Sequence, residues 1–123
     1  MLAINTETML IELTRGDTAS IVFSAVDKDG TTYTPSTGDK LKFAVAKKVG
    51  ADPIFEIETE KTAGNTDDDF WTIVIPSTAT NEMKFGDYAY DVQLSNQGGV
   101  DTIIGKTDDI SPTFRLWGEV ATE

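Results

Sequence analysis

Acidic side chains supply most of the chemically reactive groups in this chain. Asp and Glu number 21, against 10 Lys and Arg and no His or Cys, so the formal net charge is −11. A pair of carboxylates is enough for glycoside hydrolysis, but with so many acids almost any pair can be proposed. Without His and Cys there are no Ser-His or Cys-His nucleophile pairs, no His- or Cys-ligated zinc and no disulfides. We therefore expect no enzyme: the sequence offers no catalytic, cofactor-binding or metal-binding residue to assign, and no cofactor.

Two acidic stretches have the composition of a calcium site. Asp27 and Asp29 take the first and third ligand positions of an EF-hand loop. Thr32 and Gly38, however, stand where that loop requires Gly and a bidentate Glu, so we interpret the stretch as a hairpin turn. At Thr66–Asp69, the TDDD loop at 66–69, three adjacent carboxylates repel one another, and a divalent cation would relieve that repulsion. The sequence allows both a solvated loop and a cation site there.

An integrin-type tripeptide, Arg15-Gly16-Asp17, stands between the stretches MLIEL and TASIVF. Integrin ligands present this tripeptide at the tip of an exposed loop, whereas the flanking stretches here leave almost no loop. Gly16 tolerates a positive φ, and Asp17 can accept hydrogen bonds from backbone N–H groups just beyond it. We predict a bend that serves the fold.

The charge and the N-terminus limit the partners and the location. A net charge of −11 repels phosphate backbones and anionic lipid, so we expect no nucleic acid and no membrane partner. The start, MLAINTETMLIEL, lacks a basic region followed by an unbroken apolar run, and no later run approaches the ~20 apolar residues of a membrane span. We expect no signal peptide and a protein that is made and assembled in a cytoplasm.

The elements that would position these groups are strands. Apolar and polar residues alternate in several segments, and the turn residues Gly, Asn, Asp and Pro recur at about ten-residue spacing. The predicted core-facing sets are Ile21, Phe23 and Ala25; Leu41, Phe43 and Val45; Phe55 and Ile57; Trp71, Ile73 and Ile75; and Tyr88, Tyr90, Val92 and Leu94. We expect the last two sets to face each other across the core.

This pattern predicts an all-β fold, an antiparallel β-sandwich of seven to eight strands in a single domain over residues 1–123. One segment, Pro76–Met83, indicates helix, and it is long enough for a single turn that Ser77 or Thr78 would cap.

Aromatic side chains raise an alternative function. If Tyr33, Tyr88, Tyr90, Trp71 and Trp117 shared one exposed face, they would form a stacking surface for a sugar. The alternation instead places Tyr88, Tyr90 and Trp71 with the core, and it leaves Trp117 unassigned. A carbohydrate- or calcium-binding β-sandwich module is therefore the alternative to a protein whose function lies in protein–protein contacts.

The order of these features resembles a known family. The stretch FGDYAYDVQL, Phe85–Leu94, is similar to a strand of the immunoglobulin-like domain at the N-terminus of phage baseplate upper proteins, with the pattern Gly-x-Tyr-x-Tyr-Asp-(Val/Ile)-Gln. In that family, as predicted here, one short helical turn precedes the strand. The resemblance extends over residues 11–120, including the RGD bend, and departs from the family pattern at Lys106–Pro112, an insertion before the last strand. It implies an immunoglobulin-like fold and a structural or adaptor module of a phage tail, baseplate or virion. The implied partners are other phage structural proteins and further copies of the chain, and the implied location is the virion.

The last strand of the chain suggests where such contacts form. A strand at a chain end is often the edge of a sheet, and the stretch FRLWGEV is apolar with few charges. We predict that Phe114, Leu116 and Trp117 lie on an edge strand that a neighbouring subunit covers.

Overall fold

The computed structural model describes residues 2–5, 7–25, 31–62 and 69–118. Within these ranges the chain forms nine strands and one short helix. They are β1 (Leu2–Asn5), β2 (Leu10–Thr14), β3 (Ala19–Ser24), β4 (Lys40–Ala46), β5 (Pro53–Glu60), β6 (Phe70–Ile75), α1 (Ser77–Thr80), β7 (Gly86–Asn96), β8 (Gly99–Ile104) and β9 (Thr113–Trp117). The predicted all-β class is confirmed. There are nine strands instead of seven to eight, because β1 has only 4 residues and shows too little alternation to be recognised. No helix in this described part of the chain is long and apolar enough to cross a membrane.

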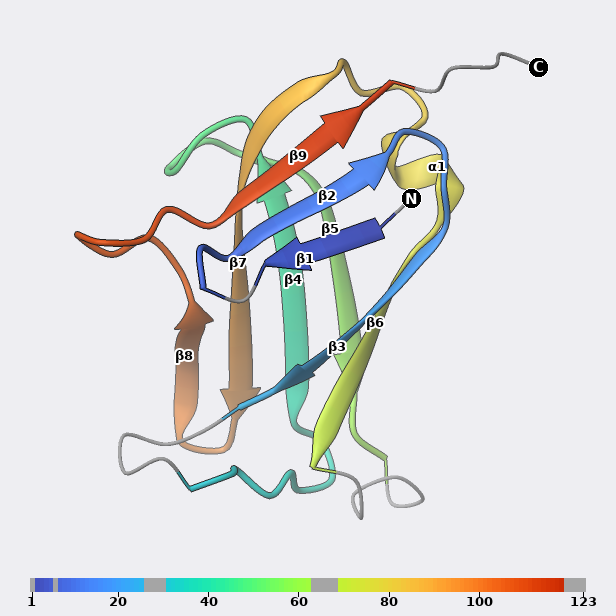
Figure 1. Cartoon of the computed structure of the whole chain (residues 1–123). Coiled ribbons are helices and arrows are strands. Elements are labelled where there is room, and N and C mark those ends of the chain that lie inside the picture. Colours follow the sequence, from blue (N-terminus) through green and yellow to red (C-terminus); the bar gives the residue numbers. More distant parts are fainter. Residues whose placement is uncertain (1, 6, 26–30, 63–68, 119–123) are drawn as a thin grey trace.

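The strands form a large and a small sheet in a sandwich-like arrangement. The large sheet has seven strands in the order β1-β2-β9-β7-β4-β5, with β8 also paired to β7, and the small sheet contains β3 and β6. Figure 1 shows β3 crossing in front of β4, so the small sheet covers one side of the large one. The long strand β7 pairs with β4 along one edge, while its other edge pairs first with β9 and then with β8. This exchange of partners lets the large sheet bend around the core.

The predicted core-facing sets lie between the two sheets. Trp71, Ile73 and Ile75 of β6 are at most 2% exposed, and the buried set of β7 lies across the core from them in the large sheet. At the centre, the Phe43 ring of β4 lies 6.1 Å from the Phe23 ring of β3, between ring centroids. Aromatic contacts of this kind link the two sheets and add to the stabilisation that burial of the rings provides. In the predicted β7 set, Tyr90, Val92 and Leu94 are buried and Tyr88 is half-buried.

The prediction of a C-terminal edge strand is wrong. β9 lies inside the large sheet, with β2 on one side and β7 on the other, and its Phe114 and Leu116 side chains are 0% and 1% exposed. The pairing of β2 with β9 is parallel, so the sandwich is not antiparallel throughout. Trp117 is 46% exposed on the outer side of β9, where its indole N–H donates to the Glu12 carboxylate at 3.3 Å. A strand near the end of the chain became central because a distant N-terminal strand, β2, pairs with its outer edge.

The RGD tripeptide is the bend that carries the chain from the large sheet to the small one. Gly16 has φ +85°, a left-handed conformation that glycine tolerates. The Gly16 amide donates to the Thr80 hydroxyl at 2.9 Å, and the Asp17 amide donates to the Thr14 carbonyl at 3.1 Å. The Arg15 guanidinium lies over the Phe85 ring, with 4.3 Å between the Cζ atom and the ring centroid. These contacts hold the bend against the segment that contains α1.

The short helix forms where it was predicted, but neither predicted cap closes it. Pro76 occupies the N-cap position, and no side chain makes a capping hydrogen bond. Ser77 and Thr78 lie inside the helical turn instead of before it. The Thr80 side chain is fully buried, and its hydroxyl accepts the hydrogen bond from the bend. The helical turn is thus held by its tertiary contacts, which the local sequence does not reveal.

Candidate interaction surface

The outward side of the small sheet carries no charged side chain. Because side chains alternate along a strand, the residues between the buried ones point to solvent. We call this surface the uncharged face, and it consists of Ser20, Val22 and Ser24 of β3 and Phe70, Thr72 and Val74 of β6. Three of these are large apolar side chains with substantial exposure: Val22 at 61%, Val74 at 48% and Phe70 at 43%.

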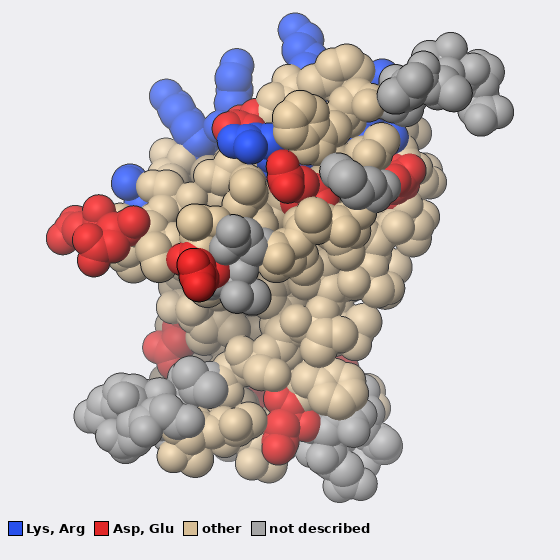
Figure 2. All heavy atoms as spheres, viewed as in Figure 1, with Lys and Arg blue, Asp and Glu red and all other residues tan. Residues whose placement is uncertain are grey.

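The three apolar side chains form one strip. In the antiparallel register, Val22 lies opposite Thr72, Ser20 opposite Val74, and Ser24 opposite Phe70. Val22 is therefore diagonal to both Phe70 and Val74, and diagonal neighbours on one face are within reach of large side chains. Figure 2 shows tan surface over the area of β3 and β6, with acidic side chains at its margins and the basic side chains in the upper part of the view. The strip carries no charge although the chain as a whole has a net charge of −11.

The backbone edge of β3 is a second feature of this surface. Among the residues that the structure describes, β3 pairs with β6 alone. The β6 side of the small sheet lies near β5, and there the buried Lys61 ammonium donates to the Phe70 carbonyl at 2.6 Å. Just beyond β3, the Tyr33 amide donates to the Ala25 carbonyl at 2.8 Å. The part of β3 without a second strand is therefore the span Ala19–Ser24.

The outward side of the large sheet is different in kind. On β4 and β5, Lys42 lies 3.2 Å from Glu56, and Lys40 lies 3.7 Å from Glu60. On β7 and β9, Asp87 accepts two hydrogen bonds from Arg115, at 2.7 and 3.2 Å, and the guanidinium lowers the pKa of the Asp87 carboxyl. Covering this face would remove water from many charges at once, which costs free energy that the ion pairs recover only in part. The large sheet therefore presents a solvated surface.

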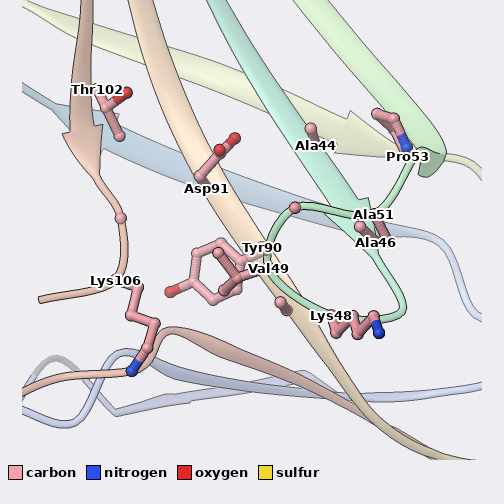
Figure 3. Close-up of a pocket in the computed structure, with 13 residues that line it drawn as sticks. Ala44, Ala46, Lys48, Val49, Ala51, Pro53, Tyr90, Asp91, Thr102 and Lys106 are labelled. Carbon is pink, nitrogen blue, oxygen red and sulfur yellow. The ribbon is translucent and has the colours of Figure 1, made fainter.

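A groove of about 400 Å³ lies on the outward side of β4 and β7 (Figure 3). Small side chains leave this space open: Ala44 and Ala46 alternate with buried residues on β4, and Ala89 does so on β7. Lys48, from the loop after β4, and Lys106, from the chain after β8, lie at its rim with exposed side chains. The groove results from short side chains beside two flanking loops.

The chemistry of this groove does not fit a stacked sugar. Tyr90 is the one aromatic among its described lining residues, and that side chain is 6% exposed, with its hydroxyl donating to the Met9 carbonyl at 2.9 Å. Burial raises the pKa of the Asp91 carboxyl, and the charge of Lys42 acts against that rise. Trp117, the aromatic that the sequence left unassigned, lies on β9 and is not among these lining residues. Of the five aromatics that the sequence suggested for sugar stacking, only Tyr90 is among the described residues that line this groove.

The two acidic stretches proposed as calcium sites lie mostly outside the described residues. Asp27 and Asp29 fall in residues 26–30, and residues 66–68 of the TDDD stretch are likewise not described. Asp69, its last member, is exposed. In the described ranges no group of three or more His, Cys, Asp and Glu side chains is placed to hold a metal ion. Both stretches stay predictions.

Buried polar residues near the small sheet were not predicted from the sequence. Asp39 and Lys61 are 2% and 4% exposed. The Asp39 carboxylate accepts from the Tyr33 hydroxyl at 2.5 Å and from the Ser36 amide at 2.9 Å, and its hydrogen bond raises the pKa of Tyr33. The Lys61 ammonium lies 5.1 Å from the centre of the Trp71 ring. These contacts fix the loops at one end of the sandwich, a structural role that alternation along single strands cannot reveal.

The uncharged face was also missed, although the sequence carries a signal for it. Residues 18–26 and 70–81 contain no charged residue, whereas a quarter of the whole chain is charged. Such charge-free runs fit a core strand as well as an exposed one, so only the pairing of β3 with β6 brings their outer residues together.

No protein-family model matches this chain, and no curated protein matches it.

Proposed function

We propose that the protein is a structural or adaptor module of a phage tail, baseplate or virion and works through protein–protein contacts. The observation that carries this proposal is the uncharged face, with three exposed apolar side chains on a chain of net charge −11. Exposed apolar side chains that are contiguous and surrounded by polar residues are typical of a surface that contacts another protein. The phage assignment itself rests on the resemblance of the FGDYAYDVQL strand and its flanking elements to baseplate upper protein domains.

The alternative, a carbohydrate- or calcium-binding module, has less support. Sugar-binding surfaces need exposed aromatic rings side by side, and the groove beside β7 offers none among its described lining residues. A cation at the TDDD stretch is compatible with an assembly module as well as with a ligand-binding one, so it does not favour the alternative. We therefore place function in surfaces and not in a pocket.

The test of this role is the presence of the protein in assembled particles. Particles released by a host that carries the gene are purified on a density gradient and probed with an antibody against the chain. We expect the protein in the particle band at a constant ratio to the tail proteins, and we expect deletion of the gene to stop tail assembly. If the protein stays in the unassembled fraction and deletion leaves particle yield unchanged, the proposed function is wrong.

A further inference from the structure

The β3 edge lacks the features that protect exposed strands. Natural sheets guard their edges with charged side chains, proline, bulges or very short strands. The sequence of β3, ASIVFS, has none of these over 6 residues. The other outer strands do: β1 is 4 residues long, β5 begins with Pro53 and carries three Glu, and β8 contains Asp101. β6 has the same length and no charge, but its other edge lies near β5, so among the described strands β3 is the longest edge that is open to pairing with another strand.

We propose that β3 pairs with β3 of a second copy of this chain, antiparallel and across a two-fold axis. The pairing joins the two small sheets into one sheet of four strands, in the order β6-β3-β3-β6, and merges the two uncharged faces. This inference rests on the proposed function, because it names the contact through which the module associates. A two-fold contact is self-complementary, so the same edge serves both copies.

Charge favours a second copy at this place and disfavours it elsewhere. Two chains of net charge −11 repel each other, and the repulsion is weakest where the approaching surfaces carry no charge. All six residues of β3 are uncharged, and so are the outward residues of its partner β6. Stacking the outer face of the large sheet would instead remove water from many charged side chains, such as those of the Lys42–Glu56 pair, which costs free energy.

Size favours edge pairing over simple stacking of the two faces. A strand of this length spans about 20 Å, and two strands are about 10 Å wide, so the face offers about 200 Å² per copy. A standard interface needs about 800 Å² per partner. Pairing at the edge adds backbone hydrogen bonds and doubles the width of the apolar strip. We expect a weak dimer whose population depends on concentration.

The side-chain alternation restricts the register of this pairing. Opposite residues in a sheet point to the same face, and the outward residues of β3 all have even numbers: Ser20, Val22 and Ser24. The numbers of two paired residues must therefore add up to an even number. With the axis at Val22, this residue faces its own copy. With the axis at Ile21, Val22 of one chain faces Ser20 of the other, and with the axis at Phe23 it faces Ser24.

Single cysteines test this arrangement directly, because the chain contains no cysteine of its own. Val22→Cys alone, and equal mixtures of Val22→Cys with Ser20→Cys and with Ser24→Cys, are oxidised mildly and separated on a non-reducing gel. Residues opposite each other in an antiparallel pair have Cα atoms about 4.5–5.5 Å apart, within reach of a disulfide. We expect a covalent dimer in one of these three samples.

Thr72→Cys is the matched control, since Thr72 is also exposed and faces outward from the centre of β6. In the four-stranded sheet its two copies lie about 14 Å apart, three strand spacings, which no disulfide spans. If Thr72→Cys forms as much dimer as the β3 variants, the faces stack instead of pairing at the edge, and the proposal is wrong. It is equally wrong if no sample forms a covalent dimer.

A second measurement does not depend on disulfide chemistry. Val22→Lys introduces the charge that guards natural edges, at a side chain whose 61% exposure lets the fold tolerate it. Val100→Lys is its control, because Val100 on β8 is 63% exposed and lies away from the uncharged face. By sedimentation equilibrium we expect the first variant to weaken dimerisation at least about tenfold and the second to leave it within about twofold. Salt should strengthen the parent dimer or leave it unchanged, because it screens the repulsion between acidic chains.

The result is independent of the particle experiment. A chain found in particles that forms no β3-linked dimer keeps the assembly role and loses this contact. A chain that dimerises through β3 and is absent from particles keeps the contact and loses the phage role. Equal dimerisation of the Val22→Lys and Val100→Lys variants would also count against the β3 edge.

Discussion

The strand pairs β4–β5 and β3–β6 differ on their outward sides although both line the same core. On β4 and β5 the outward residues are largely Lys and Glu, joined by ion pairs such as Lys42 with Glu56 at 3.2 Å. On β3 and β6 the outward residues are Ser, Thr, Val and Phe, with no charge at all. The inward residues of both pairs are apolar except for Thr59 of β5. Packing in the core thus restricts every second residue of a strand. It does not restrict the residues between them, whose charge and polarity depend on what the outward side contacts.

This difference separates two uses of a sheet surface. A face covered with ion pairs is stable in water and expensive to dehydrate, so it resists association. A face of hydroxyl and apolar groups loses little hydration when it is covered, and covering it removes apolar area from water. Within one small sandwich, the large sheet therefore presents the solvated side and the small sheet presents the side suited to contact.

The largest expected effect tests the boundary between inward and outward residues. Phe43→Ala removes a ring that is 0% exposed and that packs against the rings of neighbouring strands, so we expect a loss of about 3–5 kcal/mol in the free energy of unfolding. Phe70→Ala makes the same deletion on the uncharged face, at a side chain that is 43% exposed, and should cost about 1 kcal/mol or less. Urea unfolding of both variants measures the difference. Equal losses would mean that Phe70 belongs to the core and that the uncharged face is not free surface.

The second effect uses pH to mark an inward residue of β7. Burial raises the pKa of Tyr90 to about 12, from 10.0 in the unfolded chain. The unfolded state therefore releases this proton first, and the stability that the neutral phenol contributes is complete below pH 10 and disappears as pH rises from 10 to 12. A pKa shift of this size corresponds to a loss of about 2.7 kcal/mol in the free energy of unfolding. Tyr90→Phe has no such proton, so its stability should fall less than that of the parent over this range. Urea unfolding at several pH values measures the free energy of unfolding of both proteins. If the parent and Tyr90→Phe lose equal stability between pH 10 and 12, the Tyr90 ring is accessible to water.

A third, intermediate effect concerns the bend that leads from the charged sheet to the uncharged one. Gly16 has φ +85°, which a β-branched residue adopts with strain, so Gly16→Val should destabilise the fold by about 1 kcal/mol or more. Thr18→Val, two residues later and exposed, should change stability by about 0.5 kcal/mol or less. Thermal unfolding compares the two variants.

The same bend also tests the adhesion motif. Asp17→Glu abolishes integrin recognition in ordinary ligands, and we expect it to change no cell attachment here. Attachment that the parent shows and Asp17→Glu loses would instead give the tripeptide a role in adhesion.

The smallest expected effect lies on the charged face. Lys42 and Glu56 are 38% and 43% exposed in their side chains, and exposed ion pairs contribute little because water and salt screen them. We expect Lys42→Ala to change the free energy of unfolding by about 0.5 kcal/mol or less. A double-mutant cycle with Glu56→Ala measures the coupling between the two side chains. A coupling of about 2 kcal/mol or more would show that this face stabilises the fold, and the contrast between the two surfaces would then lose its basis.

Several features of the fold were predictable because they depend on neighbouring residues alone. Alternation identified the buried residues of β3, β4, β6 and β7, since successive side chains of a strand point to opposite faces. The bend at Gly16 was predicted from its place between two strands, and its φ of +85° is one that glycine tolerates. The caps proposed for α1 failed because the turn is held by a hydrogen bond between Gly16 and Thr80, residues 64 positions apart. The uncharged face was not predictable from the sequence, because the charge-free sequences of β3 and β6 also fit strands that are buried on both sides.

What the sequence determined by itself is which residues point inward, because the strand period is a local property of the backbone. Which strands lie side by side was decided only by the tertiary structure. β9 was expected at an edge and lies at the centre of the large sheet, because β2, about a hundred residues earlier, pairs with it in parallel. β3 has one partner and an open edge for the same reason, since a strand's sequence shows how it alternates but not which backbone will bond to it. The surface proposed for association follows from this non-local choice.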